Sequence, residues 1–155
     1  MSNQTNQVKP LINATFHRRL FALVYDSFVV FSFLILVTGL ALALNLGESL
    51  LPHRGLFLSY LFISTALFIG WFWQRAGQTL GMLAWRIKVV NEDLSPLTWT
   101  TALKRFLIGT LCMAAGGIGL FWCLFDKNKL ALQDKLTKTR VVHLNQKVEK
   151  RKRRS

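Results

Sequence analysis

Polar and apolar residues are sorted into blocks along this 155-residue chain and do not alternate at amphipathic spacing. Three long apolar blocks cover residues 20–44, 56–73 and 106–125. The first block contains one charged residue, Asp26, and the other two contain none. A helix rises about 1.5 Å per residue, so about 20 apolar residues cross a hydrocarbon core of about 30 Å. The pattern therefore predicts an all-α integral membrane protein with the lipid bilayer as its surroundings.

The third block differs from the first two because it contains Gly116, Gly117 and Gly119 near its middle. Glycine weakens a helix interior by about 1 kcal/mol relative to alanine and permits a tight bend. Two interpretations stay open. The block is either a third spanning helix whose glycines pack against a neighbour, or a re-entrant hairpin of two arms of about ten residues, each covering about half the bilayer. A hairpin would have to pack on the first two helices, because irregular backbone at that depth needs protein or water around it.

Net charge is distributed unevenly among the polar segments of this +13 chain. Residues 1–19 carry +3, residues 74–105 carry +3 and residues 126–155 carry +8, whereas residues 45–55 are neutral. Cytoplasmic segments of membrane proteins are the ones rich in Lys and Arg. We therefore expect the N-terminus, the loop of residues 74–105 and the C-terminal region in the cytoplasm and the neutral loop outside, which two crossings satisfy and three do not.

The same patterns divide the chain into a polar tail (1–15), a membrane domain (16–142) and a basic tail (143–155). The first apolar block is much longer than the roughly 7 to 15 apolar residues of a signal peptide, so we expect it to stay in the mature protein. The basic tail is either a solvated end or a segment attracted to anionic lipid, at about 1 kcal/mol per basic residue near the surface. In a membrane protein this charge does not indicate nucleic-acid binding.

The segment between the second and third blocks contains a predicted turn and a short element that is either a strand or interfacial. GQTLG follows the interfacial Trp71 and Trp73 and predicts a structural turn. Its motif residues are Gly77, Gln78, Thr79 and Gly81. Residues 83–90 are apolar with two interleaved basic residues, which indicates a short strand or a segment lying in the interface. Thr98 or Thr100 is expected to cap the helix that leads into the third block.

Asp26 is the main candidate for chemistry, because a carboxylate inside hydrocarbon costs at least about 2.5 kcal/mol. It should therefore be protonated, paired or turned to a polar cavity. Arg19 precedes it by two helical turns, roughly 10 Å along the axis, so an ion pair within this helix would be strained. The partner of Asp26 is expected elsewhere. The carboxyl group is either an ion or proton site, or a structural clamp that joins two helices.

Three pieces of sequence occur in order and together carry a resemblance to a known family. They are RRLFALVYD in the first block, GQTLG followed by IKVV after the second, and ALQDKLTKTRVV near the end. The set resembles the RDD family of membrane proteins, named for one arginine and two aspartates, over about residues 16–142. By this match the arginine is Arg19 and the aspartates are Asp26 and Asp134.

This chain departs from the family pattern at two positions. Gln133 stands where a histidine often precedes the second aspartate, and Met82 stands where a lysine often follows GQTxG. The resemblance implies a bacterial inner-membrane protein and transport of an unidentified ligand, with cation/proton antiport proposed for some members. Arg19, Asp26 and Asp134 would then form an ion or proton site.

Asp134 has two possible roles that the residues alone suggest. It lies among Lys129, Lys135, Lys138 and Arg140, so it either satisfies these charges at the surface, where pairing is worth little, or folds back to pair with Arg19.

Two functions follow as hypotheses. One is a transporter subunit that works as a homo-oligomer, because two or three spans enclose little cavity. The other is an accessory or assembly protein that binds the helices of a partner membrane protein. An enzyme is not expected, since the sequence has no Gly-rich phosphate loop and no Ser, Cys and His arrangement. We expect no cofactor and no metal, because the histidines are scattered. Cys112 and Cys123, eleven residues apart on one expected helix, are interpreted as packing residues.

Overall fold

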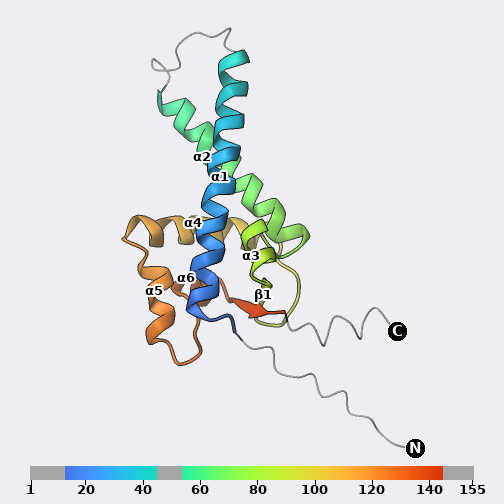
Figure 1. Ribbon diagram of the computed structural model, residues 1–155, viewed down its shortest axis with the longest axis vertical. Coiled ribbons are helices and arrows are strands. Elements are labelled where there is room, and N and C mark those ends of the chain that lie inside the picture. The colour runs from blue at the N-terminus through green and yellow to red at the C-terminus, as the bar shows by residue number, and fades with distance from the viewer. Residues whose placement is uncertain (1–12, 45–53, 145–155) are drawn as a thin grey trace, which may run out of the picture.

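The computed structural model describes residues 13–44 and 54–144. Figure 1 shows two long helices that extend from a smaller assembly of short helices and a two-stranded sheet. Most of the polar N-terminal tail, most of the neutral loop and residues 145–155 lie outside the described part. The expected attraction of the basic tail to anionic lipid therefore falls outside the described residues.

The first two apolar blocks form the long helices α1 (Phe16–Leu44) and α2 (Arg54–Arg75). Both are long and apolar enough to cross a membrane, as predicted, and only 6% of the most apolar window of α1 is buried inside the protein. The two helices contact through stacked rings of Phe33 and Phe68, whose centroids lie 4.2 Å apart. The Tyr60 hydroxyl also donates to the Val37 carbonyl oxygen at 3.3 Å. Most apolar side chains of α1 thus face outward, which is stable in lipid and unstable in water.

The third block is broken into two helices, α4 (Trp99–Ala114) and α5 (Ile118–Phe125), which meet at an angle of 91°. Gly116 and Gly117 form the corner with φ angles of +80° and +79°, a conformation that costs glycine little. Helix α4 packs on α2 and runs across the long axis of the molecule (Figure 1). The expectation of one continuous helix in this block is therefore wrong, and the bent form of the two alternatives is present.

The arms of this bent pair differ from the expected two arms of about ten residues. Helix α4 starts earlier because Thr98 caps it, accepting from the Thr101 amide at 3.3 Å. Thr98, and not Thr100, is thus the capping residue. Cys112 and Cys123 lie in different helices because of the break, which corrects the single helix assumed for them, and both are free thiols.

The sheet consists of β1 (Ile87–Asn91) and β2 (Thr139–His143), paired antiparallel with Val89 opposite Val141. Residues 83–90, which were expected to form a short strand or an interfacial segment, contain the end of helix α3 (Leu80–Ala84) and most of strand β1. The residues before α1 also join β2, since the Ala14 amide donates to the Val141 carbonyl oxygen at 2.8 Å. A small core of buried residues lies here: Ala14, Ala22, Ile87, Val89, Leu97, Ala102 and Val141.

This pairing places both ends of the described chain on one side of the molecule, near the start of α1 (Figure 1). If α1 and α2 each cross the membrane once, α2 ends on the side where α1 begins. Strand β2 is hydrogen-bonded to the residues that precede α1. By length and composition the bent pair α4–α5 is either a broken span or a re-entrant loop.

Candidate functional site

Asp134 lies between two arginines in the interior of the protein. Its Oδ2 atom is 2.5 Å from Arg19 Nη1, and its Oδ1 atom is 2.6 Å from Arg105 Nη2. The carboxylate is fully buried. Burial alone would raise the pKa of Asp134, but the charges of Arg105 and Arg19 and their hydrogen bonds outweigh it and hold that pKa below its ordinary value. Asp134 is thus a buried anion that is shared by two cations.

The network joins four elements. Asp134 belongs to the short helix α6 (Leu132–Leu136), Arg19 to the first turns of α1 and Arg105 to α4. Arg105 Nη1 donates to the Thr139 hydroxyl in β2, and Arg19 Nε donates to the Ala14 carbonyl oxygen at 3.2 Å. Every element that meets at this point is therefore tied to a single carboxylate.

The predicted pairing of Arg19 with Asp134 is confirmed, and the alternative role of Asp134 at the surface is wrong. The fold turns α6 so that Asp134 faces inward, while Lys129, Lys135 and Lys138 are exposed. Lys135, for example, pairs with Asp126 at 2.5 Å and is 43% exposed.

Arg105 is the residue of this network that the sequence interpretation missed, because charge counting placed it in a cytoplasmic loop. A signal was present. The helix capped at Thr98 carries Ala102, Arg105 and Phe106 at positions i, i+3 and i+4, and all three are buried. This spacing marks the inward face of a helix, so an arginine on it required an interior partner.

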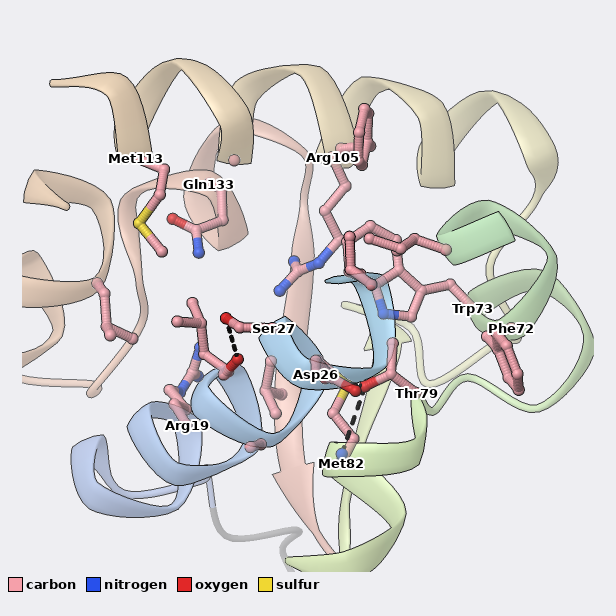
Figure 2. A pocket seen from close by; sticks show the side chains of 18 of the residues that line it. Arg19, Asp26, Ser27, Phe72, Trp73, Thr79, Met82, Arg105, Met113 and Gln133 are labelled. Carbon is pink, nitrogen blue, oxygen red and sulfur yellow. Dashed lines mark hydrogen bonds between the residues drawn. The ribbon is translucent and has the colours of Figure 1, made fainter. Parts of the chain in front are cut away.

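Asp26 finds its partners in the GQTLG segment, as its strained spacing from Arg19 required. Its Oδ2 atom accepts from the Thr79 hydroxyl, and its Oδ1 atom accepts from the Gly81 amide at 2.8 Å. Thr79 is also the N-cap of α3 and accepts from the Met82 amide at 3.3 Å (Figure 2). The Asp26 carboxylate therefore joins α1 to the start of α3.

The four motif residues of GQTLG each have a structural role here. Gly77 adopts a φ angle of +69° and forms the expected turn, while Gln78 Nε2 donates to the Ile87 carbonyl oxygen at 2.8 Å. Gly81 does not lie in the turn, which corrects that part of the prediction, but inside helix α3. A Cβ atom there would overlap the Ala22 carbonyl oxygen and lie 2.9 Å from Asp26 Cγ. Only glycine allows this close approach of α3 to α1.

A cavity of about 320 Å³ lies between α1, α2 and α4 and reaches down to α3 and α6. Charged and polar side chains line it, several of them labelled in Figure 2: Arg19, Asp26, Ser27, Trp73, Thr79, Arg105, Thr110 and Gln133. Aromatic and aliphatic side chains form the rest of the wall. Two of the three predicted site residues, Arg19 and Asp26, thus line one cavity, and Asp134 lies behind it. The two positions that depart from the family pattern, Met82 and Gln133, line the same cavity.

Some polar atoms of the lining have no partner among the described residues. They are Arg105 Nε, Trp73 Nε1 and Gln133 Oε1, all buried. Asp26 forms no ion pair within the described part of the chain, where the ion pairs found are Arg19–Asp134, Arg105–Asp134 and Lys135–Asp126. The cavity thus offers unused hydrogen-bonding capacity next to an anion and a cation.

The three sequence pieces that resemble the RDD family meet in this site: the first piece carries Arg19 and Asp26, the second carries Thr79 and Gly81, and the third carries Asp134. The model of the RDD family matches residues 13–138. This chain belongs to the RDD family. No curated protein and no solved structure matches it. In this RDD protein the arginine and the second aspartate form one buried ion pair, and the first aspartate stands apart from them at the cavity wall.

Proposed function

We propose that this RDD protein is a transporter of the bacterial inner membrane, or a subunit of one, that binds its solute in the cavity between α1, α2 and α4. In this proposal Asp26 couples solute binding to a proton or a cation. One observation carries it: a carboxylate of an apolar membrane helix lines a cavity and is held by two hydrogen bonds without an ion pair among the described residues. Ionisable groups in membrane segments mark ion and proton pathways more often than not.

The contacts of Asp26 suggest how coupling would work. Both of its oxygens accept hydrogen bonds, one from the Thr79 hydroxyl and one from the Gly81 amide. A proton on Oδ2 would make that oxygen a donor, so the Thr79 hydroxyl would have to accept instead of donate, whereas Oδ1 would still accept from the Gly81 amide. A bound cation would compete for the same lone pairs. Either event would change how Asp26 holds the start of α3. Leu80 and Met82 of α3 and its N-cap Thr79 line the cavity.

A second candidate function is supported by the outward faces of the long helices. Only 6% of the apolar window of α1 and 11% of that of α2 are buried. These surfaces suit lipid, a second copy of the chain or the helices of a partner membrane protein. In an accessory or assembly protein of this kind, Asp26 would be a permanent clamp on α3. Neither proposal includes an enzymatic step.

The proposed orientation follows from the distribution of charge. Residues 1–19 and 126–155 are basic, and the residues before α1 are hydrogen-bonded to β2. Cytoplasmic segments carry the excess of Lys and Arg. We therefore place the N-terminal end, the sheet and the C-terminal end in the cytoplasm, with α1 and α2 crossing the membrane. Oligomerisation, or a partner subunit, would complete a pathway that two spans cannot enclose.

The experiment that tests the transport proposal compares proton movement in vesicles that contain the purified protein. Sodium, potassium and lithium gradients are applied in turn to the wild-type chain, to Asp26→Asn and to Asp93→Asn. Asp93 is exposed in the turn before α4 and accepts a hydrogen bond from the Ser95 amide. Asp93→Asn is therefore a matched control that removes one carboxylate outside the cavity. We expect cation-driven exchange in the wild type and in Asp93→Asn and none in Asp26→Asn, provided that this variant folds and inserts. Exchange in none of the three would favour the accessory function.

A further inference from the structure

The cavity lining includes two hydrogen-bond donors that the ion-pair network does not use. Arg105 Nη1 donates a hydrogen bond to the Thr139 hydroxyl, and Arg105 Nη2 forms the ion pair with Asp134. The Nε–H group of Arg105 has no partner in the described part of the chain. The side chain is 4% exposed. Its guanidinium carbon lies 5.4 Å from the ring centroid of Trp73, whose indole N–H is also buried and unpartnered there. Figure 2 shows both side chains at the same end of the cavity.

Buried donors are nearly always paired in folded proteins. Two such donors that line one cavity therefore need an acceptor there, which ordered water or a group of a bound molecule can supply. A guanidinium N–H and a neutral N–H on neighbouring side chains suit an oxygen-rich group, and a hydrogen bond to a charged partner is about twice as strong as a neutral one.

Charge favours an anionic acceptor. Arg19 and Arg105 share one carboxylate, that of Asp134, so this buried network carries one positive charge in excess. The Asp26 carboxylate lines the same cavity but forms an ion pair with neither arginine among the described residues, so it does not neutralise this charge by direct contact. A buried charge without a counter-ion is costly. A carboxylate placed at Arg105 Nε would supply that counter-ion.

The remaining wall defines the rest of the ligand. Most of the other lining side chains are apolar, among them Val30, Phe68, Phe72, Phe106 and Leu120. The cavity of about 320 Å³ has room for one acyl chain of medium length.

We propose that the cavity binds a single-chain aliphatic carboxylic acid. Its carboxylate accepts from Arg105 Nε–H and Trp73 Nε1–H, and its chain lies between α1, α2 and α4. The inference rests on the proposed function in that it names the solute class of the same cavity. Its test is a binding measurement without any ion gradient, so the two claims can fail separately.

Binding of radiolabelled decanoate is measured to the full chain in phosphatidylcholine nanodiscs, with empty nanodiscs as background. Trp73→Phe removes the indole N–H and keeps an aromatic ring. Trp71→Phe is the matched control, because Trp71 lies on the same helix, is 47% exposed and does not line the cavity. We expect saturable binding of one decanoate per chain and no displacement by an equal concentration of 1-decanol. We expect an affinity about tenfold weaker in Trp73→Phe and unchanged in Trp71→Phe.

A second pair of variants tests where the acyl chain of decanoate binds, without changing either tryptophan. Gly109 lines the cavity, and the position that a Cβ atom would take there has nothing within 4 Å. Gly39 on α1 has the same free space but lies outside the lining. Gly109→Leu should fill the apolar part and abolish decanoate binding, whereas Gly39→Leu should not change it.

Three results would overturn the inference: no saturable binding to the wild type, equal displacement by 1-decanol, or equal affinities within each matched pair of variants. Absent decanoate binding together with intact proton exchange would remove the ligand and leave the proposed transport function. Decanoate binding without exchange would confirm the ligand and remove the coupling.

Discussion

Replacing Asp134 by asparagine removes the one negative charge between Arg19 and Arg105 and keeps the shape of the side chain. The two ion pairs measure 2.5 and 2.6 Å, and the carboxylate is fully buried. Opposite charges about 4 Å apart attract by roughly 4 kcal/mol at an effective dielectric constant of about 20. Relaxation of the arginines toward water offsets part of the loss of both attractions. We expect the free energy of unfolding to fall by about 3–5 kcal/mol, the usual cost of breaking a buried pair.

The assay is reversible unfolding of the purified chain in bicelles, with Asp126→Asn as the matched control. Asp126 pairs with Lys135, which is 43% exposed, and such partly exposed pairs are worth about 1 kcal/mol or less. Equal destabilisation by the two substitutions would refute the argument that the buried network holds these elements together.

Exchange of the charges at positions 19 and 134 sharpens the same prediction. If Arg19 and Asp134 formed an isolated pair, Arg19→Asp combined with Asp134→Arg would restore the stability that each single reversal loses. Arg105 also contacts Asp134, so the exchange would place an arginine against Arg105. We expect no restoration, and a full rescue would show that Arg105 is not part of the network.

The pH dependence of this effect follows from the lowered pKa of Asp134. A carboxyl group whose pKa is lower in the folded than in the unfolded protein stabilises the fold above its unfolded pKa, about 3.9 for aspartate. This stabilisation is lost as the pH falls through the folded pKa. The difference between wild type and Asp134→Asn should therefore be constant at neutral pH and shrink on acidification below about pH 4.

Two further predictions concern the packing of α3 and the bent helix pair. Gly81→Ala should lower the free energy of unfolding by about 2 kcal/mol or more, because the added methyl group would overlap the backbone of α1. Gly55→Ala is the control and should have little effect, because a Cβ atom there has nothing within 4 Å. Equal melting temperatures of the two variants would contradict the close approach of α3 to α1. In a chain without its native cysteines, single cysteines placed at the exposed positions Lys127 and His17 should be labelled from the same side of the membrane by an impermeant thiol reagent. Labelling from opposite sides would show that the third block crosses.

The long helices were predictable because block length alone decides whether a helix can cross a bilayer. The break at Gly116 and Gly117 was predictable only as an alternative, since glycines serve both as corners and as packing surfaces. The sheet was harder. Residues 139–143 are a short segment within a basic region, and their partner strand lies about fifty residues earlier in the chain. Pairing over such a separation leaves no local periodicity to detect.

The candidate site shows the same division between local and long-range information. Asp26 was identifiable because a lone carboxylate in an apolar block is conspicuous, but its partners in GQTLG depend on how α3 packs on α1. Asp134 is surrounded by basic residues in sequence, yet its partners come from α1 and α4. Arg105 was missed because a cation next to an apolar block usually marks the membrane boundary, and here it faces the interior.

Proton flux driven by a cation gradient in vesicles, compared between the wild-type chain and Asp26→Asn, tests most directly whether the cavity carboxylate couples transport. Asparagine keeps the size of the side chain and an acceptor for the Gly81 amide but cannot ionise. We expect flux in the wild type and none in Asp26→Asn, although both fold and insert. Equal flux in the two chains would show that Asp26 is a structural clamp and not the coupling group.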